Sequence, residues 1–387
     1  MKISAFIIFF AIVLTILFFI NYYIYWHGLK AIGQNPTIRL IYTIIFVGLA
    51  SAYFLGRIVE RFSNGIMVRF LEWMGAYWLG AMVYFLLIVI AIDLFRLINH
   101  YVPLIPAGLR QNLQQLKIAV GIAAIIVVSI VLIIGRWNAT HPQIKNLEID
   151  IHKKANAEAI SIAFASDIHL GSLVGQRQLK QLVEIIEVKQ PDLILFGGDL
   201  LDEDLLPVIR RNLGQCLEEL RAPLGKFTVT GNHEFIGGVD NAVQYLENHG
   251  ITVLRDSSIQ LSNGIWIIGR DDRDGKRFSG GESRQALNEL ISEVNSKQPL
   301  ILLDHQPVNL SESIVNGIDL QLSGHTHHGQ LWPLNYITSK LFQISRGYKL
   351  IEKTHFLVSS GFGTWGPPIR LASRSEIYFI KVNFISD

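Results

Sequence analysis

The sequence predicts a membrane region of about four helices followed by one soluble α/β domain. Three observations predict this organisation. The first third of the chain is very apolar, whereas the remainder has the composition of an ordinary soluble domain. In that remainder, strand-like and helix-like segments alternate. Short polar segments follow several of the strand-like runs, which is where an α/β sheet presents side chains to a crevice.

The overall composition already indicates a membrane protein. Half of the 387 residues are hydrophobic and only 17% are charged, against roughly 25% charged residues in a typical soluble domain. A net charge of +2 is too small to predict nucleic-acid binding. The single cysteine, Cys216, excludes an intrachain disulfide, and its apolar surroundings predict a small buried side chain.

Four apolar stretches predict the membrane helices. We expect the spans at residues 3–26, 38–56, 73–95 and 117–135, within a membrane region that covers residues 1–136. A helix needs ~17–25 apolar residues to cross a bilayer, and four such runs exceed what a soluble fold would bury as core helices. Bulky aromatic residues, in place of small ones, follow the first stretch, which favours a retained helix over a cleaved signal peptide.

The basic residues of the short loops predict the orientation. One side carries Lys2, Arg57, Arg61, Arg69, Arg136, Lys145, Lys153 and Lys154, and the other carries Lys30, Arg39, Arg96, Arg110 and Lys117. The small excess places the N-terminus and the soluble domain in the cytoplasm. Asp93 lies at the edge of the third span, where we expect it to pair with Arg96 or to reach water.

The soluble half predicts an α/β domain with two sheets. Residues 137–158 are polar and form a linker or a first extramembrane strand, and the domain covers residues 159–387. Strand-like runs are expected at 160–166, 193–197, 227–230, 265–269, 300–304, 320–323, 356–358 and 377–382, and helices at 177–190, 205–220 and 241–249. The short connections between the later strands predict a second sheet rather than one doubly wound sheet.

Acids, an amide and histidines follow these strands in a suggestive order. The segments are Asp167-Ile168-His169, Gly198-Asp199-Leu200-Leu201-Asp202, Gly231-Asn232-His233-Glu234, Asp271-Asp272, Asp304-His305 and Gly324-His325-Thr326-His327. Residues two apart at a strand end point the same way and can hold one ion. Carboxylates mixed with imidazoles suit Mn, Fe or Zn, whereas an all-oxygen set would suit Mg or Ca. The pattern therefore predicts metal-assisted hydrolysis.

The pattern D-x-H, G-D-x-x-D, G-N-H-[DE], a lone H and G-H-x-H resembles the calcineurin-like metallophosphoesterase superfamily over the whole soluble half. The resemblance implies a four-layer α/β/β/α sandwich with a two-metal centre between its sheets. It assigns one metal to Asp167, His169, Asp199 and His327, and the second to Asp199, Asn232, His305 and His325. It also implies that His233 acts near the leaving group as a catalytic residue, that Asp202 orients His233, and that Glu234 fills the family's acidic position.

The segment Gly324–Gln330, together with Gly269-Arg270-Asp271-Asp272, resembles the branch that carries the G-H-T-H-x-G-Q signature. That branch includes membrane-anchored phosphoesterases and a hydrolase of UDP-2,3-diacylglucosamine. His328 stands where the branch often has glycine, and this departure bears on the size of the pocket.

The chemistry expected of such a centre is hydrolysis by a hydroxide that bridges two divalent metal ions. Cations ~3.5–4 Å apart neutralise phosphate oxygens and lower the pKa of a bridging water towards ~7. Mn is the first expectation, with Fe, Zn and Mg as alternatives. The substrate would be a phosphodiester or pyrophosphate, and the membrane region favours a lipid or a nucleotide-lipid. The alternatives are a phosphodiesterase of soluble nucleotides tethered to the membrane, a non-catalytic scaffold, and a transporter with a regulatory hydrolase domain.

Several residues keep two interpretations at this stage. Asp271 and Asp272 are turn residues or part of the site, and Arg370 and Arg374 are structural or contact an anionic substrate. The apolar run of Leu331, Trp332, Pro333, Leu334 and Tyr336 is core, or it forms a lip that faces the membrane or an acyl chain.

Overall fold

The computed structural model describes residues 3–60, 62, 65–280 and 283–385. The chain divides into two compact units. The first unit comprises Met1–Arg136 with Gly366–Ile369, and the second comprises Trp137–Trp365 with Arg370–Asp387.

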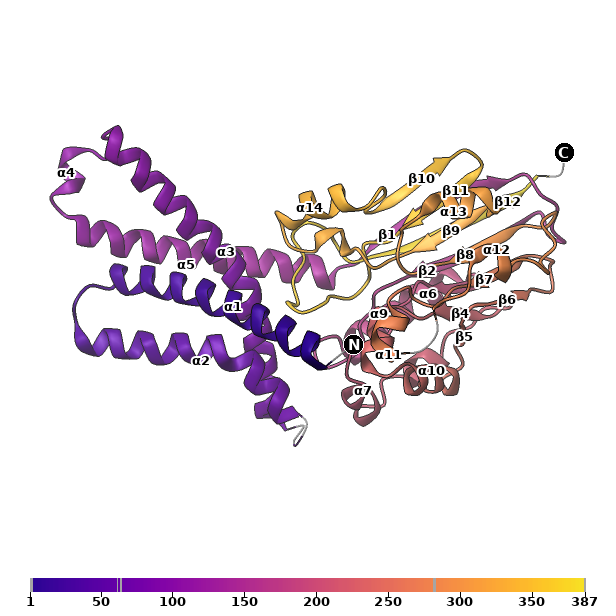
Figure 1. Cartoon of the computed structure of the whole chain (residues 1–387), viewed down its shortest axis with the longest axis horizontal. Coiled ribbons are helices and arrows are strands. Elements are labelled where there is room, and N and C mark those ends of the chain that lie inside the picture. Colours follow the sequence, from indigo (N-terminus) through magenta and orange to yellow (C-terminus); the bar gives the residue numbers. More distant parts are fainter. Residues whose placement is uncertain (1–2, 61, 63–64, 281–282, 386–387) are drawn as a thin grey trace. The chain divides into compact units, whose positions relative to one another are not determined.

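The first unit is built from long apolar helices (Figure 1). They are α1 (Ile3–Ala31), α2 (Pro36–Glu60), α3 (Ile66–Tyr101) and α5 (Leu113–Thr140), with the short α4 (Ala107–Arg110) between the last two. Four of them are long and apolar enough to cross a membrane. Many of their large apolar side chains are exposed, among them Phe18, Ile44 and Ile133, as expected for helices whose solvent is lipid.

A polar cluster joins α1 to α3 at the position of Asp93. The Tyr23 hydroxyl donates to Asp93 Oδ2 at 2.6 Å, and His27 Nε2 lies 3.0 Å from both carboxylate oxygens. Arg96 Nη1 donates to Asp93 Oδ1 at 3.4 Å. Asp93 therefore pairs with Arg96, as expected, and also links two helices through Tyr23 and His27.

The second unit contains two six-stranded sheets (Figure 1). The strands are β1 (Gln143–Ile151), β2 (Ala159–Ala165), β3 (Leu193–Phe196), β4 (Lys226–Val229), β5 (Thr252–Leu254), β6 (Ser257–Gln260), β7 (Trp266–Gly269), β8 (Leu300–Leu303), β9 (Leu320–Ser323), β10 (Gly347–Ile351), β11 (Thr354–Val358) and β12 (Glu376–Phe384). The orders are β1-β12-β2-β3-β4-β5 and β10-β11-β9-β8-β7-β6. Strand β1, which pairs in parallel with β12, lies in the segment expected to be a linker or a first strand.

The helices of the second unit are α6 (Gln176–Lys189), α7 (Leu206–Arg210), α8 (Gln215–Glu218), α9 (Asn232–Gly237), α10 (Val239–Asn248), α11 (Gly275–Ser279), α12 (Leu287–Leu290), α13 (Leu310–Val315) and α14 (Leu334–Leu341), with the 3-10 turn η1 (His327–Gly329). Those that contribute side chains to the cores, α6, α7, α8, α10, α12 and α13, cover the outer faces of the sheets.

The side chains of the strands sort into separate cores, as the period of two along a strand requires. On β2, Ile162 and Phe164 enter the core between the sheets, whereas Ala163 and Ala165 face the core under α6, α8 and α10. The second sheet buries its outer face against α12 and α13, through Leu287 and Leu310. The four-layer α/β/β/α sandwich expected from the resemblance is confirmed.

Candidate metal centre

The polar turns of the second unit lie at the carboxyl ends of parallel strands. Asp167 follows β2, Asp199 follows β3, Asn232 follows β4, His305 follows β8 and His325 follows β9. Five of the residues assigned to the metals by resemblance have left-handed backbones, namely Asp167 (φ 51), His169 (φ 52), Asp199 (φ 51), His325 (φ 70) and His327 (φ 45). Such conformations cost of order 1–3 kcal/mol each and cluster at functional sites. The turns therefore hold these side chains in place at the expense of stability.

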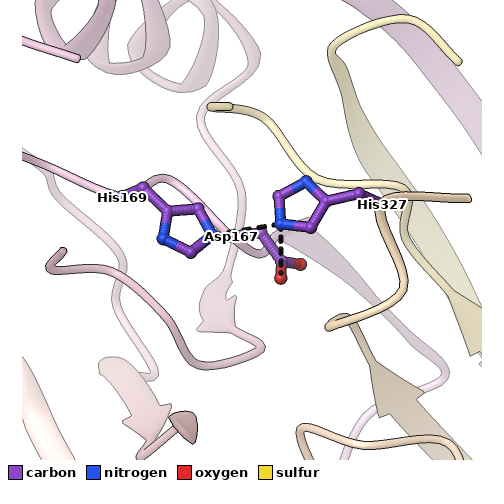
Figure 2. Close-up of side chains that lie close together, drawn as sticks. All are labelled: Asp167, His169 and His327. Atoms are coloured by element: carbon purple, nitrogen blue, oxygen red, sulfur yellow. Dashed lines mark hydrogen bonds and ion pairs between the residues drawn. The ribbon is translucent and has the colours of Figure 1, made fainter. Parts of the chain in front are cut away.

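The first cluster consists of Asp167, His169 and His327, all buried. Figure 2 shows the two imidazole rings directed at each other beside the carboxylate. His169 Nε2 lies 3.1 Å from His327 Nε2, and His327 Nε2 lies 3.5 Å from Asp167 Oδ1. Asp199 Oδ2 approaches His169 Nε2 to 3.9 Å, so Asp199 completes the four residues assigned to the first metal.

The second cluster consists of Asp199, His305 and His325. Asp199 Oδ2 lies 3.1 Å from His305 Nε2. Asn232 joins the cluster because its Oδ1 lies 2.9 Å from His325 Nδ1. Asp199 also forms a third group of possible ligands with His169 and His233. It therefore connects the two clusters, as a ligand that bridges two ions would.

The donor atoms of these clusters fit a bound cation. Burial lowers the pKa of His169 to about 3 and that of His325 to about 4, so both imidazoles are neutral and keep a lone pair for coordination. His305 Nδ1 lies 2.7 Å from the Gly197 carbonyl oxygen and donates to it, while Nε2 has no hydrogen-bond partner among the described residues. Burial opposes the charged ring, but Asp199 raises the pKa of His305 well above its ordinary value.

Two glycines are required by the close approach of backbone to carboxylate. A Cβ atom added to Gly324 would collide with the Asp167 carboxylate, and one added to Gly231 would collide with that of Asp199. Only glycine therefore fits at the start of these two turns.

His233 and Asp202 lie beside the two clusters. His233 Nδ1 is 3.2 Å from Asp202 Oδ1, and the His233 backbone N–H donates to Asp199 Oδ1 at 2.9 Å. Burial opposes protonation of His233, but the Asp199 and Asp202 carboxylates outweigh it and raise its pKa to about 9. The ring centroid of His233 is 4.6 Å from that of His169, so this imidazole lies next to the first cluster.

Glu234 ties two of the turns together, a role that sequence patterns did not specify. Its buried carboxylate accepts the backbone N–H groups of Gly231 at 2.7 Å, Leu201 at 3.0 Å and Asp199 at 3.1 Å. Through these hydrogen bonds, the glutamate of the G-N-H-E motif fixes the neighbouring G-D-x-x-D turn relative to its own turn.

Arg370 contacts the first cluster through His327. Its side chain is 0% exposed, so it cannot contact substrate from solvent, which was one of its two interpretations. The guanidinium donates to the carbonyl oxygens of Ser360 (2.7 Å) and Gly363 (2.9 Å), and its Nη2 lies 3.1 Å from His327 Nδ1. A lone arginine more than forty residues beyond His327 gives no local sequence pattern from which this role follows.

The remaining polar residues of the strand-end turns lie outside both clusters. Asp304 pairs with Arg284 at 2.8 Å, and Asp271 pairs with Arg255 at 2.8 Å. Buried Asp272 accepts from Gln306 Nε2 at 3.0 Å. The His328 ring Nδ1 lies 2.9 Å from Ser345 Oγ.

Comparison with known proteins gives the same family for the soluble half. The profile of the family described as calcineurin-like phosphoesterase matches residues 160–329. An uncharacterised metallophosphoesterase of Aquifex aeolicus is 34% identical over 242 residues, which are 62% of this chain and 91% of that protein. Clustered histidines and aspartates in such a fold suit divalent metal ions.

Two further relatives bear on the membrane region: one aligns over nearly the whole chain, and the other is named a transmembrane protein. An uncharacterised metallophosphoesterase of Campylobacter jejuni is 29% identical over 97% of this chain and 98% of its own length. A zebrafish (Danio rerio) transmembrane protein with a metallophosphoesterase domain is 30% identical over 66% of this chain and 61% of its own length. With the four candidate membrane helices, these similarities indicate a membrane-associated protein.

Proposed function

This chain belongs to the calcineurin-like phosphoesterase family, and we propose that it is a membrane-anchored dinuclear enzyme that hydrolyses a phosphodiester or pyrophosphate bond of a lipid. The observation that carries the proposal is the pair of clusters that Asp199 connects, since Asp199 belongs to the second and its Oδ2 lies 3.9 Å from His169 Nε2 of the first. Divalent ions in these clusters supply Lewis-acid chemistry, because they neutralise phosphoryl oxygens and acidify a water molecule.

Each residue of the centre has a separate task in this proposal. The first ion would be held by Asp167, His169, Asp199 and His327, and the second by Asp199, Asn232, His305 and His325. His233, held by Asp202, donates a proton or a hydrogen bond to the leaving oxygen. No protein nucleophile is required.

The direct test of the function is removal of the metal. We expect the full chain in detergent to hydrolyse bis(4-nitrophenyl) phosphate, to lose this activity after exhaustive chelation, and to regain it with Mn²⁺. Parallel additions of Fe²⁺, Zn²⁺ and Mg²⁺ rank the metals. Undiminished hydrolysis by protein shown to be metal-free by elemental analysis would refute the proposal.

The lipid part of the proposal rests on an exposed apolar face beside the first cluster. Helix α14 begins five residues after η1, and Trp332, Tyr336 and Leu341 are 48%, 62% and 74% exposed. Leu331 is only 6% exposed and belongs to the core. The lip therefore begins at Trp332. Exposed apolar patches of this kind mark membrane or ligand contacts.

We expect the triple replacement of Trp332, Tyr336 and Ile337 by serine to impair hydrolysis of a lipid substrate selectively. Buried acyl contacts contribute ~0.8 kcal/mol per methylene, so losing two lowers kcat/KM about tenfold. The measurement compares a diacylglycerol 4-nitrophenyl phosphate in mixed micelles with bis(4-nitrophenyl) phosphate. Leu331→Ser is the control, because loss of a core side chain should lower Tm and impair both reactions. A parallel fall on both substrates in the triple variant would remove the support for a lipid.

The side of the membrane on which the catalytic unit lies follows from the loop charges. Arg57, Arg69 and the basic residues after Arg136 favour a cytoplasmic catalytic unit, because basic loops remain in the cytoplasm. A reporter fused after Asp387 checks this prediction. We expect a cytoplasm-dependent reporter to be active there, and activity of a reporter that functions only outside would reverse the assigned topology.

The alternatives differ from the proposal in observable ways. A tethered phosphodiesterase of soluble nucleotides would show no preference for micellar substrate. A scaffold on a degenerate fold is disfavoured because every residue assigned to the metals by resemblance is present and every one of them lies in or against the two clusters.

A further inference from the structure

A cavity of about 700 Å³ opens in the second unit between α9, α11 and the start of α12. Phe235, Asp272 and Ala286 are among the residues that line it. Its volume lies within the ~300–1,000 Å³ of small-molecule sites. It contains none of the residues assigned to the metals.

The cavity adjoins the second cluster through shared turns. Asp272, in its wall, accepts a hydrogen bond from Gln306, the neighbour of His305. The backbone N–H of Asp272 donates to Thr230 Oγ1 at 3.2 Å, and Thr230 lies two residues before Asn232. Phe235 lies two residues after His233, on the same helix α9. An organic group attached to a phosphate at the second cluster would therefore have this cavity next to it.

The charges of the cavity wall are balanced. Three basic and four acidic side chains line it, and the most buried of them are already paired. Arg255 donates to Asp271 from Nε at 3.0 Å and from Nη2 at 2.8 Å, and Arg284 Nη1 donates to Asp304 at 2.8 Å. A second phosphate would find no unpaired buried cation here. The wall instead offers both donors and acceptors.

One side of the cavity is aromatic. The Arg255 guanidinium lies over the Phe235 ring at 5.6 Å from its centroid. Gly275 leaves room for this ring, because a Cβ at that position would meet Phe235 at 2.8 Å. Phe235 itself is 6% exposed, so a flat ring would meet the Arg255 guanidinium that covers it. A ring edged by hydroxyl or amide groups matches such a wall, because it can lie on the guanidinium plane and form hydrogen bonds at its rim.

We propose that this cavity is the subsite for an uncharged polar substituent of the scissile phosphate, a ring that carries hydroxyl or amide groups. The inference rests on the proposed phosphoesterase function and deepens it. The substrate would then have two unlike substituents, with its polar group in this cavity and its apolar group at the α14 face.

Two chromogenic diesters that release the same 4-nitrophenolate test the subsite in the full chain. One is 4-nitrophenyl thymidine 5′-phosphate, whose nucleoside is uncharged and carries hydroxyl and imide groups, and the other is bis(4-nitrophenyl) phosphate. The variant is Ala286→Trp, which places an indole in the cavity from the exposed residue that precedes α12. The matched control is Asn288→Trp, because Asn288 is exposed two residues further on, within α12, and does not line the cavity.

We expect the native chain to prefer the nucleoside diester in kcat/KM by about tenfold, the effect of one or two hydrogen bonds. Ala286→Trp should abolish that preference through KM, and Asn288→Trp should retain it. An equal ratio of the two kcat/KM values in the native chain and in Ala286→Trp would overturn the subsite. A lack of metal-dependent hydrolysis of either diester would instead refute the phosphoesterase function itself.

Discussion

Replacing Asp199 by alanine should abolish activity more completely than any other single substitution at the centre. Its Oδ2 lies 3.1 Å from His305 Nε2 of the second cluster and 3.9 Å from His169 Nε2 of the first, so its loss should weaken both metal sites at once. It also accepts the backbone N–H of His233. Each 1.36 kcal/mol of lost transition-state stabilisation is tenfold in rate, and metal ions supply several kcal/mol, so we expect a fall of more than about 10³-fold.

Metal analysis and single-turnover rates measured on the same sample check this prediction. The native chain should contain two ions and the Asp199→Ala variant fewer than one. Asp240→Ala serves as the matched control, because the Asp240 side chain is 94% exposed and its removal should change neither quantity. A variant that keeps two ions and most of its rate would exclude Asp199 as a bridging ligand.

The local motifs of the centre could be predicted because each one lies within a few residues of a strand end. Asp167, Asp199 and Asn232 each follow an apolar run that becomes a parallel strand, and such strands end at the same edge of a sheet. Periodicity does not say how the two sheets face each other. The family resemblance supplied that arrangement and with it the expectation that His327 and His169 hold one metal; their Nε2 atoms lie 3.1 Å apart.

Contacts between distant segments could not be predicted from the sequence. Arg370 reaches His327 from 43 residues away, and no spacing rule connects an arginine to a histidine over that distance. Glu234 stood in a position that the family reserves for an acid, yet its three backbone donors depend on the fold. The apolar run after His328 likewise contains both a core residue, Leu331, and exposed ones such as Trp332, because hydrophobicity alone does not specify a face.

Apolar patterning did not predict every element boundary, because it carries no information about the backbone conformation of single residues. The helix expected over residues 205–220 is two short helices, α7 and α8. Between them Asn212 adopts a left-handed conformation with φ 48, which ends a right-handed helix. Gly214 packs so closely against His249 that a Cβ would clash with the ring. The apolar spacing of the segment is that of one helix, but the turn at Asn212 divides it into two.

The second large effect should come from His233→Gln, and it should depend on the leaving group. His233 is directed at Asp202 through Nδ1, and the carboxylates that surround it raise its pKa to about 9. The Asp202 carboxylate in particular favours the protonated ring, which can act as a proton donor. Departure of an alkoxide requires that proton, whereas 4-nitrophenolate leaves without it. General acid catalysis contributes about 10²–10⁴-fold, so we expect a loss of that size on a dialkyl phosphodiester and a much smaller loss on bis(4-nitrophenyl) phosphate.

Metal content separates this role from a structural one. If His233 acts on the leaving group, the glutamine variant keeps both ions, because the residues assigned to them are untouched. Asp202→Asn should show the same dependence on the leaving group with a smaller loss, since the ring keeps its place but loses the carboxylate that favours its protonated form. Loss of an ion together with equal losses on both diesters would instead make His233 a metal ligand. That outcome is a real competitor, because His233 also lies within coordinating distance of His169 and Asp199.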